Sequence, residues 1–299
     1  MTVATSLPQT ALSSRVRDVL GLFKLRIGVL IMVTALVGAL VTAGPRLSLL
    51  QWTVLALSVL TASASAGAFN QYHERHSDRL MKRTRERAFV TGALVASPFW
   101  LWVMAVMLVA AVATAAVVLN PVSALFVFLG AFFYAVVYTV WLKRRTWWNI
   151  VIGGMAGSFA VLAGAAAVDP LPGAIPLLLA LALFLWTPPH FWALAIAGRA
   201  DYAAAGVPML PVVVGNPRAA RAVLVSTVAL VLVSLLPLLY GAGIVYGIAA
   251  CAGGGWFVHK AILLARSPEQ RPAAIACFLA SLVQLSTLLL AAGIDALMR

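Results

Sequence analysis

The chain has 299 residues, of which 63% are hydrophobic and only 10% charged. Soluble domains carry about 25% charged residues, so this composition excludes a soluble globular enzyme, a disordered chain and a disulfide-stapled secreted module. Lysine and arginine number 21 against 8 aspartates and glutamates, a net charge of +13. In a protein of the lipid bilayer such an excess is typical of cytoplasmic loops, and no nucleic-acid partner is expected.

Apolar runs long enough to cross a bilayer as helices recur along the whole chain. Nine are predicted, which indicates an all-α integral membrane protein whose two termini lie on opposite sides. Turn pairs such as Gly44-Pro45 and Asn120-Pro121 separate the runs. The predicted spans are 27–43, 50–69, 98–118, 122–141, 149–168, 173–196, 219–239, 243–264 and 273–296.

The basic residues predict the orientation, because cytoplasmic loops are enriched in lysine and arginine. With the N-terminus cytoplasmic, 19 of the 21 basic residues fall inside, and Arg46 and Arg299 fall outside. We therefore expect residues 1–26 to form a cytoplasmic N-terminal segment and 27–299 to form one polytopic domain in the cell (plasma or inner) membrane. Two long polar segments follow the second and sixth spans and suggest an internal duplication.

The densest polar cluster follows the second span. Asn70, Glu74 and Asp78 recur at every fourth residue and therefore share one helical face. Oxygen ligands in such a row suit Mg²⁺, which takes one or two carboxylates and completes its shell with phosphate and water. Basic residues that follow directly supply positive charge for a phosphate group. The alternative is a solvated loop whose bases only set the topology. The bases are Lys82, Arg83, Arg85 and Arg87.

A second cluster lies late in the sixth span, where Pro188 and Pro189 are adjacent. Paired prolines remove backbone donors, so we expect the helix to break there. His190 follows between aromatic residues, and three interpretations stay open for it: contact with a large planar substrate, ligation of a metal, or a satisfied core histidine. Asp201, just beyond the span, is a further carboxylate for a metal.

The third polar segment begins at Lys143, which is followed by Arg144 and Arg145. These bases either contact phosphate or propionate groups or only set the topology. Gly153 and Gly157, spaced four residues apart, form a small-residue face that favours close helix packing.

Six segments, within about residues 22–215, together resemble the intramembrane prenyltransferases of the UbiA superfamily. Those enzymes use Mg²⁺ and a prenyl diphosphate, and the chain looks like the branch that transfers a farnesyl group to haem. The Asn70 row is shared across the superfamily, whereas the segments at His190 and Asp201-Tyr202 are specific to that branch. The segments are Lys24-Leu-Arg26-Ile-Gly, Asn70-xxx-Glu74-xxx-Asp78-xx-Met81-xx-Thr84, Tyr138-Thr-xx-Leu-Lys143-Arg, Asn149-xxx-Gly153-Gly-xx-Gly157, Trp-Thr-Pro-Pro-His190-Phe-Trp and Asp201-Tyr-xx-Ala-Gly-x-Pro-Met-Leu-Pro.

The chain departs from the superfamily pattern at four places. Glu74 stands where aspartate is common, which keeps the carboxylate and lengthens its reach. His190 lies near the first carboxylate of the second acidic motif, so the ligands of a second metal stay open. Ala88 and Ala160-Val161 replace prolines.

The resemblance implies a single prenyltransferase domain of about nine helices around an intramembrane cavity, with active-site loops on the cytoplasmic side. Its implied substrates are haem B and farnesyl diphosphate, which with water give haem O and diphosphate, and its implied cofactor is Mg²⁺. A functional link to haem A synthase or terminal oxidase assembly follows. The implied residues are Asn70, Glu74, Asp78 and Asp201 for catalysis and the metal, Lys82, Arg83, Arg87 and Lys143 for the diphosphate, and His190, Trp186 and Trp192 for haem.

Three other functions stay open. A UbiA-type prenyltransferase with a quinone precursor or chlorophyllide as acceptor would share the Asn70 row. A membrane transporter places ionisable groups near the bilayer midplane, whereas here the acidic groups cluster at helix ends on one side. A non-catalytic assembly factor for a terminal oxidase leaves the Asn70 row unexplained.

Overall fold

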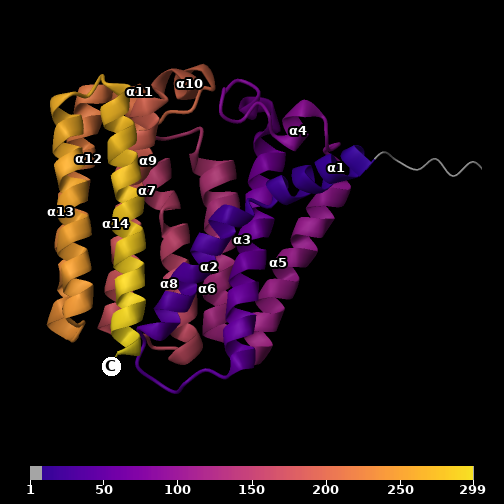
Figure 1. The fold of residues 1–299 in the computed structure, drawn as a ribbon. Coiled ribbons are helices and arrows are strands. Elements are labelled where there is room, and N and C mark those ends of the chain that lie inside the picture. Colours follow the sequence, from indigo (N-terminus) through magenta and orange to yellow (C-terminus); the bar gives the residue numbers. More distant parts are fainter. Residues whose placement is uncertain (1–8, 299) are drawn as a thin grey trace, which may run out of the picture.

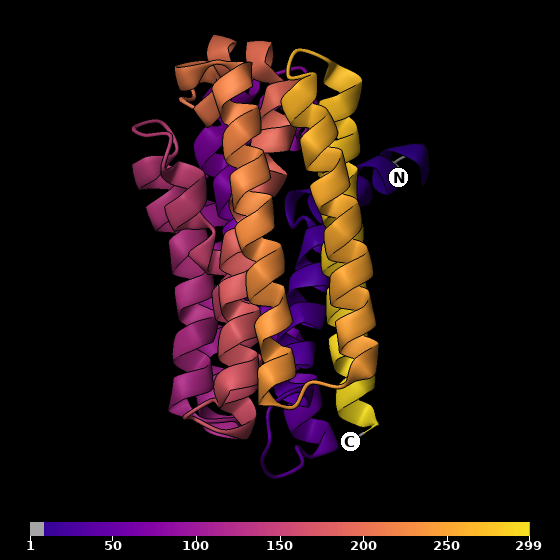
Figure 2. The same cartoon turned by 90° about the vertical axis from the view of Figure 1, so that its left-hand side faces the viewer.

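The computed structural model describes the backbone of residues 9–298 and the side chains of residues 16–298. The side chain of Arg15 and the whole of Arg299, which the charge argument counts, lie outside these ranges, as do residues 1–8 of the N-terminal segment. All regular elements of the described residues are helices, and the long ones run side by side in one bundle (Figures 1 and 2). The predicted all-α membrane fold is therefore confirmed.

The helices follow the predicted spans closely. In chain order they are α1 (Gln9–Leu22), α2 (Leu25–Leu40), α3 (Leu49–Asp78), α4 (Ala88–Thr91), α5 (Pro98–Val118), α6 (Pro121–Phe132), η1 (Phe133–Leu142), α7 (Asn149–Gly153), α8 (Met155–Val168), α9 (Ala174–Ala197), α10 (Arg199–Ala204), α11 (Leu210–Val214), α12 (Asn216–Leu235), η2 (Leu236–Tyr240), α13 (Ile244–Arg266) and α14 (Arg271–Leu297).

Eight helical stretches of the described chain are long and apolar enough to cross a membrane. The first predicted span is the exception, because α2 passes this test only together with Val16–Leu22 of α1, from which it is bent by 44°. Counting that bent pair as one span gives the nine predicted. The boundary at residue 26 and the cytoplasmic position of the N-terminus stay predictions.

The short polar elements gather at one end of the bundle. There α1, α4, α10 and α11 lie close to the ends of the long helices, whereas α14 ends on the opposite side (Figure 1). The two long polar segments, 70–97 and 197–218, therefore share one end of the molecule. This is the arrangement that an odd number of spans and the charge distribution predict.

Local sequence signals explain where the helices that carry the site begin. Ser48 caps α3 in a capping box with Gln51, and Asn120 caps α6 ahead of Pro121. The helix α3 then continues for 30 residues, well beyond the apolar run 50–69. Its last three turns carry Asn70, Glu74 and Asp78, so these side chains lie on the same rigid element as the membrane span.

The predicted break at the paired prolines is wrong. Pro188 and Pro189 lie inside α9, which is helical from Ala174 to Ala197. The two missing N–H groups leave only two carbonyls, those of residues 184 and 185, without their usual partners. Packing against α12 and α14 holds this part of α9 in the bundle, where both prolines and His190 are buried. Tertiary packing therefore overrides the helix-breaking tendency of the prolines.

The crossing of α2 and α8 depends on two glycines. A methyl group on Gly164 would overlap the carbonyl of Ala35, and one on Gly38 would overlap the carbonyl of Val161. Each obstacle is backbone, which cannot move aside as a side chain can. Such close backbone approach through small residues is a common mode of helix association in membranes.

We expect Gly164→Ala to lower the free energy of unfolding by about 3 kcal/mol, the upper part of the range for overpacking. The reason is that the two helices must separate to admit the methyl group. The unfolding midpoint of the detergent-purified protein measures this. Gly173→Ala is the matched control, because no atom lies within 4 Å of the added methyl. Equal midpoints for the two variants would contradict the tight crossing.

Candidate active site

The polar row of α3 is buried. Asn70, Glu74 and Asp78 are 3%, 5% and 3% exposed, and the Asn70 Nδ2 donates a hydrogen bond to Glu74 Oε2 at 2.9 Å. The three side chains thus share one helical face, as the spacing predicts. The alternative of a solvated loop is excluded for these three residues, because each is enclosed by protein.

Each member of the row is paired with a basic side chain from another part of the chain. Lys143 forms an ion pair with Glu74, and the Arg87 guanidinium lies 2.6 Å from Asp78 Oδ2. Lys24 Nζ donates to Asn70 Oδ1 at 2.7 Å. Buried charges are costly without such partners. The pairing therefore lets α3 hold two carboxylates inside the protein.

A π-helical turn completes the surroundings of the row. In η1 the backbone N–H of Lys143 bonds to the carbonyl of Tyr138 five residues earlier, at 2.9 Å. Thr139 Oγ1 accepts from Asn70 Nδ2 at 3.0 Å, and the Tyr134 hydroxyl accepts from Lys24 Nζ at 3.0 Å. Such wide turns inside α-helices frequently mark functional sites. Here η1 directs Thr139 and Lys143 toward α3, and Tyr134 toward Lys24.

Lys24 has a strained backbone at the bend between α1 and α2. Its φ of 48° and ψ of 42° are left-handed, a conformation that residues other than glycine rarely adopt. Gln71 fixes the same bend, since its Nε2 donates to the carbonyls of Gly21 and Leu22 at 3.0 and 2.9 Å. Contacts to α3 thus hold Lys24 in place beside Asn70.

Lys24, Tyr134 and Thr139 were not assigned a role by the sequence. Lys24 and Thr139 fall in segments that match the superfamily, and this was the only signal for them. Tyr134 sits in an apolar run, where hydropathy does not distinguish a π-helical turn from a regular one. Their grouping appears only when three separate elements pack together.

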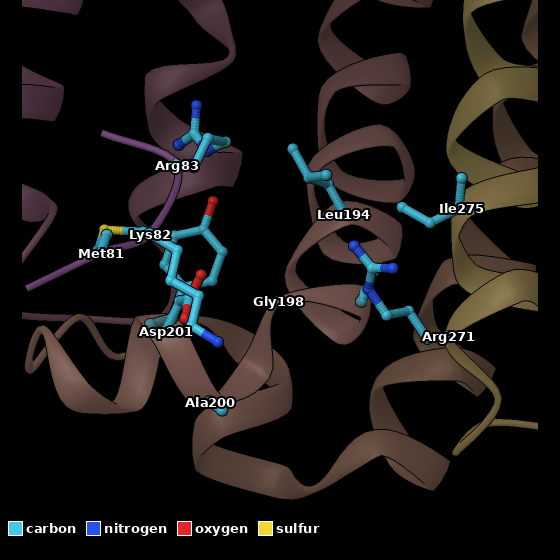
Figure 3. A pocket seen from close by; sticks show the side chains of 11 residues that line it. Met81, Lys82, Arg83, Leu194, Gly198, Ala200, Asp201, Arg271 and Ile275 are labelled. Atoms are coloured by element: carbon cyan, nitrogen blue, oxygen red, sulfur yellow. The ribbon is translucent and has the colours of Figure 1, made fainter. Parts of the chain in front are cut away.

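A cleft of about 560 Å³ opens where the two long polar segments meet. It contains Lys82, Arg83 and Asp201, so these three predicted residues share one space (Figure 3). A volume of this size is typical of ligand-binding sites. The full lining is Met81, Lys82, Arg83, Leu194, Ala197, Gly198, Ala200, Asp201, Tyr202, Arg271 and Ile275.

Tyr202 lies beside Asp201 on the short helix α10 and also lines this cleft. Burial raises the pKa of its hydroxyl, and the charge of Arg83 opposes part of that rise. Tyr202 therefore stays protonated at neutral pH and can donate a hydrogen bond into the cleft.

The described residues contain no cluster of three or more histidine, cysteine or acidic side chains that could hold a metal ion. The structure thus brings Asn70, Glu74 and Asp78 together, whereas Asp201 stands on the wall of the cleft. Two carboxylates and an amide oxygen nevertheless suit Mg²⁺, which needs few protein ligands when a phosphate supplies others. The donor set on α3 fits such a metal.

The remaining acidic residue of this segment is at the surface. Glu86 is 82% exposed and approaches Arg85, at 3.8 Å. Exposed pairs of this kind contribute little to stability or binding. Glu86 lies outside the buried row, as its position in the sequence predicts.

His190 lies in an aromatic cluster between α9 and α14. It stacks on Trp186, with ring centroids 4.0 Å apart, and Phe278 lies 4.6 Å away. Its Nδ1 is 2.6 Å from Ser281 Oγ, and that hydroxyl donates to the carbonyl of Phe278. We therefore assign the imidazole proton to Nδ1, which leaves Nε2 with a free lone pair.

The two tryptophans predicted beside His190 differ in their surroundings. Trp186 Nε1 donates to the carbonyl of Ser281 at 2.8 Å, so this ring is fixed against α14. Trp192 is 5% exposed in the apolar core, and its Nε1 has no hydrogen-bond partner in the described structure. Trp186 shares the aromatic cluster with His190, whereas Trp192 packs in the core of the bundle.

Comparison with known sequences identifies the chain's relatives. The UbiA prenyltransferase family model matches residues 31–282. Protoheme IX farnesyltransferase 2 of Paramagnetospirillum magneticum is 52% identical over 287 residues, covering 96% of this chain and 99% of the relative. Protoheme IX farnesyltransferase of Gloeobacter violaceus is 42% identical over 289 residues, covering 96% and 94%.

Solved structures share the fold. A structure of digeranylgeranylglyceryl phosphate synthase has a TM-score of 0.78 at 18% identity and covers 96% of this chain and 100% of that one. A UbiA homologue from Archaeoglobus fulgidus, bound to DMAPP and Mg²⁺, has a TM-score of 0.69 at 17% identity and covers 91% and 99%. Sequence and fold agree: the chain belongs to the UbiA prenyltransferase family and, within it, to the protoheme IX farnesyltransferases.

Proposed function

We propose that this protein transfers the farnesyl group of farnesyl diphosphate to a vinyl group of haem B, with addition of water, giving haem O and diphosphate. The names of relatives 42–52% identical over most of the chain support this activity. The observation that carries it is the buried row of Asn70, Glu74 and Asp78, each paired with a basic side chain, on the same helix that leads to a positively charged cleft.

Mg²⁺ is the proposed cofactor, held by Asn70, Glu74 and Asp78 with Asp201 approaching from the cleft. When bound, it would neutralise the charge of the diphosphate. Lys143 and Arg87 pair with the two carboxylates, so both cations lie beside the proposed metal ligands.

The transfer is an electrophilic alkylation in this proposal. The bond between C1 of the farnesyl group and the diphosphate oxygen breaks, and its electron pair leaves with the diphosphate. The π electrons of the vinyl group form the new carbon–carbon bond with the allylic cation. Water then adds to the resulting cation and loses a proton, which leaves a hydroxyl group on the product.

The basic side chains lower the barrier to departure of the diphosphate. Lys82 and Arg83 line the cleft, and with Arg87 and Lys143 they stabilise the negative charge that accumulates on the leaving group. Fixed charges of this kind need no reorganisation when the bond breaks. Tyr202, as a neutral donor in the lining of the cleft, can add a hydrogen bond.

The haem side of the proposal rests on His190, Trp186 and Trp192. We expect His190→Ala to weaken haem binding about tenfold, the equivalent of one aromatic contact, and to leave farnesyl diphosphate binding unchanged. Titration of the purified protein with each substrate measures both affinities. His259→Ala, on the exposed side of α13, is the control. Equal losses for the two substrates would argue against a role of His190 in haem binding.

The proposal places the protein as a multi-pass component of the plasma or inner membrane, with its active-site loops in the cytoplasm. The gathering of the polar elements at one end of the bundle, together with the basic residues, supports this orientation. Its product would connect it to haem A synthase or to the assembly of terminal oxidases.

The decisive experiment supplies the detergent-purified protein with haem B, farnesyl diphosphate and Mg²⁺. Mass spectrometry of the extracted porphyrins should show a product that has gained a farnesyl group and one water. EDTA should abolish this product, and added Mg²⁺ should restore it. Folded protein that forms no product would reject haem as acceptor, and diphosphate release against a panel of aromatic acceptors would then identify another.

A further inference from the structure

The cleft has a second wall that the diphosphate assignment does not use. Arg271 and Ile275 from the start of α14 and Leu194 from α9 form this wall, across the cleft from Lys82 and Arg83 (Figure 3). One side of the cleft is thus continuous with the metal row on α3. The other side belongs to the helices that carry the His190 cluster.

The charge balance of the cleft favours a second anionic group. Among its lining residues Lys82, Arg83 and Arg271 are basic, and Asp201 is the single acid. Within the described side chains Arg271 forms no ion pair with a carboxylate. A guanidinium presents two parallel donors that match a carboxylate, and this makes arginine well suited to bind one.

The aromatic cluster lies one helical turn beyond the cleft along both α9 and α14. The helices α9 and α14 pack against each other. Leu194 is one helical turn from His190, and Ile275 is one turn from Phe278, so each pair shares a face. At 1.5 Å per residue, the axial distance from Arg271 to Phe278 is about 10 Å. A flat acceptor in the cleft, beside these helices, would have the guanidinium of Arg271 at one edge and the apolar side chains of α9 and α14 along its face.

We propose that Arg271 binds a carboxylate of the acceptor, namely a propionate of haem. This inference rests on the proposed function, since haem is the acceptor there. The propionates and the vinyl groups stand on opposite edges of the porphyrin. Arg271 therefore fixes one edge of the ring and leaves the vinyl edge free to meet the farnesyl group. It is a binding residue that selects acceptors with a carboxylate.

The test compares the binding of two porphyrins to two proteins, in the absence of farnesyl diphosphate. Haem and its dimethyl ester are titrated into the wild-type protein and Arg271→Gln, and absorbance reports binding. We expect the substitution to weaken haem binding about tenfold, as for loss of a charge-assisted pair. The wild-type protein should bind the dimethyl ester about tenfold more weakly than haem, whereas Arg271→Gln should bind the two porphyrins equally well. Arg271→Lys should recover part of the affinity, and Arg266→Gln at the end of α13 is the matched control.

Three results would overturn the inference. The first is equal haem affinity of the wild-type protein and Arg271→Gln. The second is esterification that weakens haem binding to both proteins equally. The third is a raised KM for farnesyl diphosphate with unchanged haem affinity, which would assign Arg271 to the diphosphate. A wild-type protein that binds farnesyl diphosphate but neither porphyrin would instead reject the proposed function, so the two failures are distinguishable.

Discussion

Replacing Asp78 by alanine is expected to lower kcat about 10³-fold, the upper range for loss of one group that stabilises developing charge. Asp78 is a carboxylate of the proposed metal site and lies 2.6 Å from Arg87. Without it, the metal loses a ligand and Arg87 loses the group that positions it. The assay is the formation of farnesylated haem by detergent-purified protein at saturating substrates.

Folding should survive this change. Asp78 is at the end of α3, and Thr84 hydrogen-bonds to its backbone carbonyl, which the substitution leaves intact. The Arg87 side chain is 19% exposed and can turn toward water. The yield of monodisperse protein from the membrane checks this point, and Glu86→Ala is the control for loss of an acid from the same segment. Near-normal kcat in Asp78→Ala would remove the metal assignment.

The arrangement of charges explains why the row needs its cations. Without a bound metal and diphosphate, two buried carboxylates on one helix would repel each other and lack solvation. Lys143 and Arg87 stabilise them in that state. The same cations suit the diphosphate once a metal takes the carboxylates. One set of charges therefore serves two states of the site.

Much of the fold was predictable because membrane-spanning segments can be recognised from the composition of a short stretch of chain. Each of the nine apolar runs corresponds to a helix or a bent helix pair, and the spacing of Asn70, Glu74 and Asp78 placed them on one face. Both signals depend on residues near one another in the chain. Hydropathy and helical periodicity therefore suffice for them.

The features that the sequence did not predict depend on contacts between distant segments. Pro188 and Pro189 break an isolated helix, but packing on α12 and α14 keeps α9 intact. Lys24 reaches Asn70 only because α1 and α2 bend beside α3, and Tyr134 joins them through a π-helical turn. Arg271 is 70 residues from Asp201 in sequence and still lines the same cleft. No local sequence pattern predicts these contacts.

The second large effect is expected at Lys143. Its side chain is 15% exposed, pairs with Glu74 and lies over the ring of Tyr138, with Nζ 5.6 Å from the centroid. We expect Lys143→Gln to lower kcat about 10²-fold, because the departing diphosphate loses one of its cations. Glutamine keeps an amide donor for Glu74, so the buried carboxylate retains a partner.

A second measurement separates this role from a structural one. Lys143 competes with a metal for Glu74, and its removal should therefore leave the affinity for Mn²⁺, used as a probe without diphosphate, unchanged or higher. A collapsed site would lose metal affinity together with kcat. Arg145→Gln is the matched control, since Arg145 is exposed in the same basic run. Equally small effects of the two substitutions would mean that these bases only set the topology, and the diphosphate would then depend on Lys82, Arg83 and Arg87.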